Sequence, residues 1–215
     1  MLKTVFISGV LLGLATMIGG AGFYPLVDHP RLVSRTQVLP NGGRGEDFLI
    51  RLPVDRIVSV GTEGLSVSAV AFPGGLELPD TLSGEPSQID HFKVRDADGN
   101  VIGVAARHML ALEDTAAVAW SITIPSRGSL WLTGTVDPQS FGAAFSGIGY
   151  QPGESWSGNL DLFMGTAAES GQARGGSAEF SGLSGTYTER WNVTGIGDAG
   201  ELRGTIALST VTYLY

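Results

Sequence analysis

The sequence predicts an all-β fold: a single antiparallel β-barrel or sandwich domain, preceded by one N-terminal transmembrane or signal helix. Glycine supplies 32 of the 215 residues and charged residues only 16%, a composition that favours strands and turns. Short alternating apolar and polar runs recur between turn residues, whereas the start of the chain is an uncharged apolar stretch. We therefore expect a membrane segment over residues 1–27, a connector over residues 28–45 and an extracytoplasmic β domain over residues 46–215.

The N-terminal segment has two interpretations. Lys3 gives a positive amino end, and no charged residue occurs from Thr4 to Val27. As an uncleaved anchor, Val5 to Tyr24 would form a helix of about 30 Å, the thickness of a hydrocarbon core. As a signal peptide, the segment would be cleaved after Ala21 or Gly22. We prefer the anchor. The order of basic start, apolar middle and small residues favours an external domain, although the count of basic residues alone favours the opposite topology.

Small residues repeat along this segment at helical spacing. Gly9, Gly13, Thr16 and Gly20 follow one another at intervals of four, three and four residues, which places them on one face of a helix. Such a face lets a second helix approach closely in lipid, although glycine is also common in membrane segments generally. The pattern predicts the lipid bilayer and other membrane protein subunits as partners.

The first strands are expected after the connector. Residues 41–43 read Asn-Gly-Gly and predict a turn, and Phe48 to Leu52 has the composition of a strand that Pro53 ends. Leu65 to Phe72 is a second strand candidate, followed by Pro-Gly-Gly.

Two hairpins are expected in the middle of the chain. The first joins His91–Arg95 to Val101–Ala105 across the turn residues 96–100, and the second joins Ala117–Ile124 to Ser129–Val136. Between them, the apolar residues of Ala106–Asp114 are consistent with a short helix. From residue 141 onward, short alternating runs recur between glycines.

The last third of the chain carries one aromatic and acidic pattern. In Ser177–Trp191, the side chains of Tyr187, Glu189 and Trp191 fall on one face of a strand because side chains alternate with a period of two. They could line a cavity or a partner surface. This segment, together with Gly200–Leu208, resembles the closing strands of small bacterial secreted barrels related to the allene oxide cyclase fold. The resemblance implies a central cavity for a small apolar ligand.

Composition excludes several functions. The net charge is −8 with 13 basic residues, which argues against nucleic acid as a partner because phosphate binding needs clustered Lys and Arg. The chain has no cysteine, so it has neither disulfides nor a thiol nucleophile. No cofactor is predicted.

Motifs for catalysis or metal binding are also missing from the sequence. Asp96, Asp98 and Asn100 begin like a calcium loop, but Val101 and Arg107 stand where that loop needs glycine and glutamate. The three histidines are isolated, and no serine lies in a Gly-x-Ser-x-Gly turn. Adjacent carboxylates such as Glu46 and Asp47 are expected to be solvated loop residues.

The sequence therefore favours a non-enzymatic role. The leading hypothesis is a single-pass inner-membrane protein whose periplasmic β domain is an accessory or structural subunit of a membrane protein complex. One alternative is a periplasmic small-molecule-binding barrel or a cyclase- or isomerase-like enzyme. A second is an outer-membrane β-barrel, which the alternating Val211–Tyr215 would suit once the signal had been removed.

Overall fold

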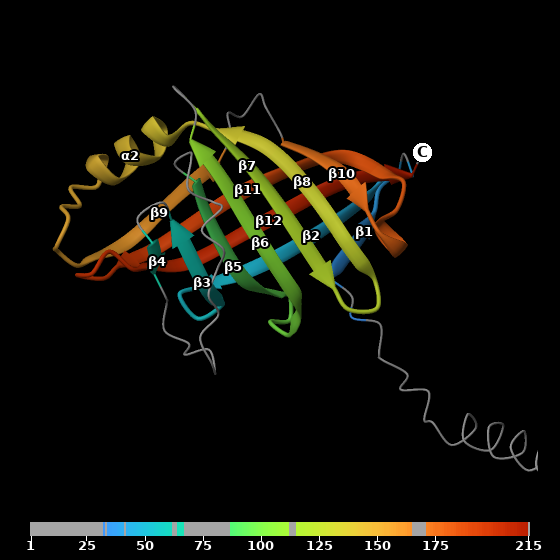
Figure 1. Ribbon diagram of the computed structural model, residues 1–215, viewed down its shortest axis with the longest axis horizontal. Helices are drawn as coiled ribbons and strands as arrows, with labels where there is room; N and C mark the ends of the chain where they lie inside the picture. The colour runs from blue at the N-terminus through green and yellow to red at the C-terminus, as the bar shows by residue number, and fades with distance from the viewer. Residues whose placement is uncertain are drawn as a thin grey trace, which may run out of the picture. The chain divides into compact units, whose positions relative to one another are not determined.

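The computed structural model describes residues 32, 34–40, 42–61, 64–66, 87–111, 115–164 and 171–214. They form one antiparallel β-barrel of eight strands with four additional strands and an α-helix (Figure 1). The barrel strands are β2 (Arg44–Leu52), β5 (Ser87–Arg95), β6 (Val101–Ala111), β7 (Ala116–Ile124), β8 (Gly128–Val136), β10 (Gly171–Gly176), β11 (Leu183–Ile196) and β12 (Leu202–Leu214). The other elements are β1 (Arg35–Val38), β3 (Arg56–Gly61), β4 (Gly64–Ser66), α2 (Pro138–Gly147), β9 (Trp156–Met164) and the 3-10 helix η2 (Ala178–Phe180).

The barrel strands follow one another around the barrel in chain order. Each pairs antiparallel with the next from β5 to β12, β12 pairs with β2, and Leu49 of β2 pairs with Arg95 of β5 to close the ring. Of the two architectures expected from the sequence, the fold is thus the barrel. In Figure 1 the strands β5, β6, β7 and β8 lie side by side as one wall, with β2, β11 and β12 crossing behind them.

The closing contact between β2 and β5 is supported by a buried ion pair. The Asp55 side chain is fully buried in the turn after β2, and Arg95 donates to both of its oxygens at 2.7 to 3.0 Å. The same carboxylate accepts the backbone N–H of Arg51 at 2.8 Å. This pair fixes the end of β2 against the β5–β6 hairpin.

Alternation along the strands places the apolar core inside the barrel. On β7, the inward side chains are 0 to 2% exposed, and one of them, Trp120, packs against Phe92 of β5 with ring centroids 5.8 Å apart. Strands that alternate in this way bury one face and leave the other to solvent or to a partner.

Both predicted hairpins are confirmed as β5–β6 and β7–β8. The helix expected over Ala106–Asp114 is wrong as far as the structure describes it. β6 continues to Ala111 and pairs with both neighbours, so Met109 and Leu110 lie on opposite faces of a strand. Residues 112–114 lie outside the described part.

One helix was not expected from the sequence. α2 begins after Asp137, whose side chain accepts the N–H of Gln139 at 2.8 Å, with Pro138 in its first turn. An N-cap aspartate followed by proline is a typical helix start. Ala144 and Phe145 of α2 pack against the core.

The barrel begins before residue 46. β1 and the first residues of β2 lie in the range expected to be a connector, and they are paired with each other. β4 covers only the start of the strand expected over Leu65–Phe72, and the rest of that strand is outside the described residues.

The membrane segment, with the helix-packing residues Gly9, Gly13, Thr16 and Gly20, lies outside the described residues. Within the part of the chain that the structure does describe, no helix is long and apolar enough to cross a membrane.

Candidate functional site

The three side chains singled out on β11 point into the barrel. Tyr187, Glu189 and Trp191 are 4%, 2% and 5% exposed. Their common face is therefore the inner face of the barrel and does not lie on the described outer surface. What they can do depends on the groups that meet them from the opposite wall.

Glu189 is the centre of a buried polar cluster. Its Oε1 accepts hydrogen bonds from Trp191 Nε1 at 2.7 Å and Arg107 Nε at 3.2 Å, and its Oε2 accepts one from Trp120 Nε1 at 2.7 Å. The Arg107 guanidinium also lies 5.8 and 5.5 Å from the ring centroids of Trp120 and Trp191. Both carboxylate oxygens are thus used within the protein.

Tyr187 extends this cluster toward β8. Its phenol has a raised pKa because of burial first and the nearby Glu189 charge second. The ring lies against Gly171, where a Cβ would overlap it, and the hydroxyl lies near Gly134. Tyr187 is therefore a neutral, inward-facing side chain that packs over two glycines inside the barrel.

The opposite side of the cluster holds two unused polar atoms. Among the described residues, Arg107 Nη2 and Asp90 Oδ1 are buried and have no hydrogen-bond partner. The two residues are paired across β5 and β6. Asp90 Oδ2 accepts from Gln88 Nε2 at 2.8 Å, so half of this carboxylate is satisfied.

A second buried cluster closes one end of the barrel. Arg127, fully buried in the β7–β8 turn, contacts Glu46 at 2.5 Å, Glu179 at 3.1 Å and the Ser34 hydroxyl at 3.1 Å. Arg44 pairs with both glutamates. The expectation that Glu46 is a solvated loop residue is wrong, because it is 4% exposed on β2 and faces inward. Its neighbour Asp47 is exposed on the other face.

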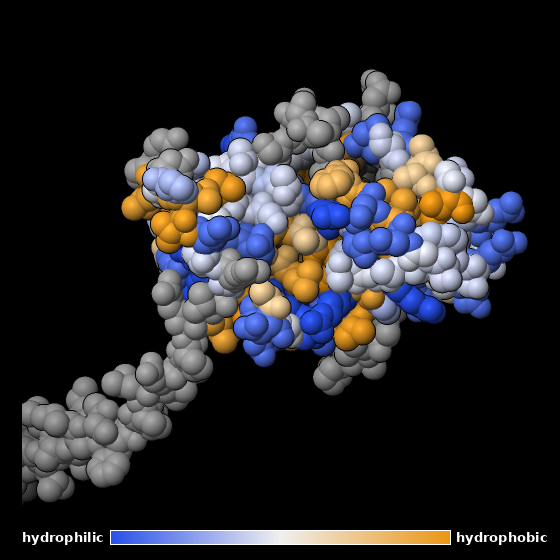
Figure 2. Space-filling view, turned by 180° about the vertical axis from the view of Figure 1, so that it is seen from behind, coloured by the Kyte–Doolittle hydropathy of each residue, from blue (hydrophilic) through white to orange (hydrophobic). Residues whose placement is uncertain are grey.

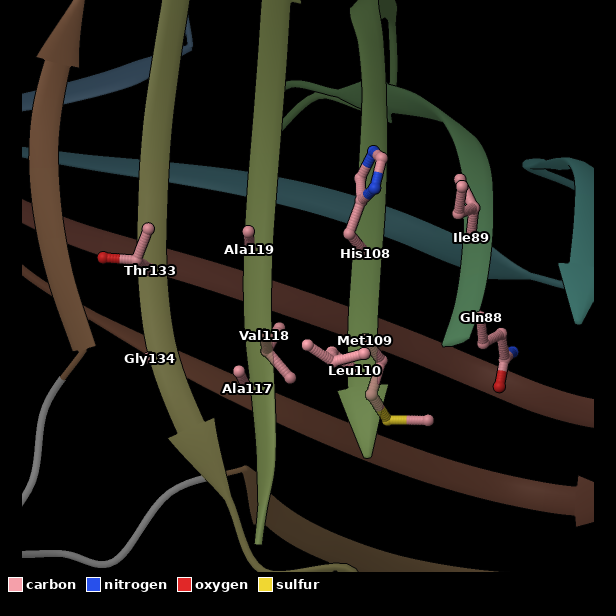
Figure 3. A pocket seen from close by; sticks show the side chains of 10 residues that line it. All are labelled: Gln88, Ile89, His108, Met109, Leu110, Ala117, Val118, Ala119, Thr133 and Gly134. Carbon is pink, nitrogen blue, oxygen red and sulfur yellow. The ribbon is translucent and has the colours of Figure 1, made fainter. Parts of the chain in front are cut away.

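The outside of the barrel carries a trough of about 290 Å³ across β5, β6, β7 and β8. Figure 3 shows the lining side chains on these four neighbouring strands. Two rows of outward side chains flank the trough, and the strand segments between them form its floor. Its lining residues are Gln88, Ile89, His108, Met109, Leu110, Ala117, Val118, Ala119, Thr133 and Gly134.

The trough is part of a larger surface, which we call the outer wall. The pairing of β5 to β8 places the following side chains on it in register: Ile89, His91, Lys93, Val104, Ala106, His108, Leu110, Ala117, Ala119, Ser121, Thr123, Ser129, Trp131, Thr133 and Thr135. None of these residues is Asp or Glu, although the chain has 21 such residues. Trp131, Val104 and Leu110 are 53%, 50% and 38% exposed.

The other side of the barrel differs in charge. Asp161 of β9 and Arg190 of β11 form an exposed ion pair at 2.9 Å, and the exposed Asp47 and Arg51 lie on β2. Figure 2, seen from behind, shows hydrophilic and hydrophobic residues interspersed over this face.

His91 and His108 are the titratable groups of the outer wall besides Lys93. Partial desolvation, followed by repulsion from His108, lowers the pKa of His91, whereas the Asp90 carboxylate acts in the opposite direction. The His108 imidazole therefore acts on His91 from the neighbouring strand β6. Within the described residues, no group of three or more His, Asp or Glu side chains could hold a metal ion.

The sequence pattern placed Tyr187, Glu189 and Trp191 on one face of β11, but it identified neither Arg107 and Trp120 as their partners nor the outer wall. A signal for the wall was present, because the outward positions of both predicted hairpins contain no acidic residue. Comparison with known proteins adds no assignment: no protein-family profile matches the chain, and no curated protein matches it.

Proposed function

We propose that the chain is a non-catalytic accessory or structural subunit of a membrane protein complex, held at the inner membrane by its N-terminal segment with the barrel in the periplasm. The barrel docks onto its partner through the outer wall. The observation that carries this proposal is the wall itself, which exposes Trp131, Val104 and Leu110 and has no acidic residue in a chain of net charge −8. Exposed apolar patches of this kind mark interaction surfaces.

The barrel interior supports a non-catalytic role. A general acid or base must reach the proton that it transfers, but Glu189 is 2% exposed and its oxygens already accept three hydrogen bonds. The apolar interior also favours this proposal over an outer-membrane barrel, because such barrels turn their apolar face outward and keep a polar interior.

The size of the wall is adequate for a partner. Four strands of about nine residues cover an area of roughly 20 by 30 Å, or about 600 Å². A standard protein interface buries about 800 Å² on each partner, so the wall can supply most of one side.

A second candidate is small-molecule binding in the trough. Its volume of about 290 Å³ lies at the lower end of the range of ligand pockets. This function would need no protein partner. The two candidate functions therefore predict different molecules bound to the outer wall in the cell: a protein in the first case and a small molecule in the second.

Site-specific photo-cross-linking tests the proposal. A photoreactive aromatic amino acid replaces Trp131 in the full chain, in living cells, and a matched chain carries it in place of Thr188 on β11, which is exposed on the other side. The proposal expects a cross-linked protein from position 131 and none from position 188. No protein adduct from position 131, or equal adducts from both positions, would refute it.

A further inference from the structure

We infer that the partner surface that meets the outer wall is acidic and presents an aliphatic or methionine anchor side chain, which enters the trough. This inference rests on the proposed function and adds the chemistry of the partner to it.

The charge on the wall gives the first part. Lys93 on β5 and the exposed Arg174 on the adjacent β10 carry its positive charge, and His91 and His108, on the same β5 and β6 side, add no negative charge. The absence of carboxylates there does not follow from composition, because the chain has 21 acidic and 13 basic residues. Complementary potentials steer partners and suppress wrong ones, so this surface selects an acidic partner.

The lining of the trough gives the second part. Ala117 and Ala119 leave room between larger neighbours, and the surrounding side chains are mostly aliphatic. A volume of about 290 Å³ corresponds to about ten water molecules in the liquid, enough for one large apolar side chain and part of its backbone. Interfaces often concentrate their affinity in one such anchor, surrounded by a polar rim.

Symmetry argues against a second copy as the occupant. In a two-fold dimer the same patch would face itself, so Lys93 would meet a surface that has no carboxylate to complement it. An anionic lipid surface would also complement the positive charge, but a trough of about 290 Å³ has room for one discrete side chain.

The experiment uses full-length chains that carry the photoreactive residue at position 131. Lys93→Glu reverses the wall charge and Ala119→Leu fills the trough, while Arg203→Glu and Ala207→Leu make the same changes on β12. Thermal unfolding of each variant checks that it folds. The cross-linked peptides of the partner are identified by mass spectrometry.

We expect Lys93→Glu and Ala119→Leu each to lower the yield of the protein adduct at least about fivefold, with both β12 controls unchanged. The partner peptide should contain an aliphatic residue or Met with Asp or Glu beside it. Unchanged yields in the folded Lys93→Glu and Ala119→Leu variants, a basic partner peptide, a second copy of this chain or a lipid adduct would overturn the inference. If position 131 still gives a protein adduct and these substitutions do not change its yield, the inference fails but the proposed accessory role is still supported. If position 131 gives no protein adduct, both the inference and the proposed function fail.

Discussion

Removal of the Glu189 charge should destabilise the barrel more than any exposed substitution. In the folded chain, Arg107 and Glu189 side chains are 4% and 1% exposed, so water cannot replace the lost partner in Glu189→Gln. An uncompensated buried charge costs about 3–5 kcal/mol. The hydrogen bonds from Trp120 and Trp191 also lose their ionic acceptor, which adds roughly 1 kcal/mol. We therefore expect a loss of about 4 kcal/mol or more.

The assay is urea unfolding of the barrel unit, residues Leu32–Tyr215, followed by tryptophan fluorescence. With a slope of about 2 kcal/mol/M, the midpoint should fall by about 2 M. Glu154→Gln, at an exposed position, is the control and should stay within about 0.5 kcal/mol of the wild type.

A double-mutant cycle decides whether the loss comes from the ion pair. Arg107→Met removes the cation, and the double variant should be less destabilised than the sum of the single variants by about 2 kcal/mol. A loss below about 1 kcal/mol for Glu189→Gln, or strict additivity in the cycle, would refute the view that this pair organises the interior.

Three further changes test other parts of the fold. Arg127→Met should cost about 3–5 kcal/mol, because it removes the fully buried arginine that pairs with Glu46 and Glu179 and leaves the partly exposed Arg44 to pair with both. Urea unfolding measures this loss, and a loss under about 1 kcal/mol would contradict the role of the cluster. Gly185→Ala should destabilise the barrel, because the added Cβ would overlap the Val211 carbonyl oxygen. In Gly142→Ala, on α2, the added Cβ would have nothing within 4 Å, so this variant should stabilise the protein by up to about 1 kcal/mol. Equal melting temperatures of the two variants would disprove this contrast. The pKa of His91 is lowered below 6.5 in the fold, so the unfolded chain takes up the proton first and stability falls as the pH drops through 6.5. His91→Gln should therefore reduce the decrease in the urea midpoint between pH 7.5 and pH 5.5. An unchanged decrease would be inconsistent with this role of His91.

The hairpins were predictable because their information is local. The turn residues at 96–100 and around Gly128 fix the reversal of the chain, and the alternation on either side fixes the buried face. The helix expected over Ala106–Asp114 failed for the opposite reason. Its few apolar residues fit either period, and pairing of β6 with two neighbours decided the outcome.

The buried polar clusters inside the apolar barrel were only partly predictable from the sequence. The period of two correctly placed Glu189 on one face with its aromatic neighbours, but Arg107 and Trp120 are 82 and 69 residues away in sequence. The burial of Glu46 could not be predicted for the same reason, because its partner Arg127 is 81 residues away in the sequence. Such pairs depend on how the strands wrap around the barrel, which no local pattern encodes.

The pairing of β2 with β12 has a consequence for the order of events during synthesis. The strands from β5 to β8 can pair as soon as each is made, since every one joins its sequence neighbour. β2 must wait for β12, as the bond from Thr210 Oγ1 to the Glu46 carbonyl oxygen, 164 residues apart, illustrates. Contacts of such long range form slowly. Until β12 emerges, the nascent chain exposes the free edges of β2 and β11, where another strand could add. The interval before the barrel closes is therefore when the chain most needs protection from pairing with other chains.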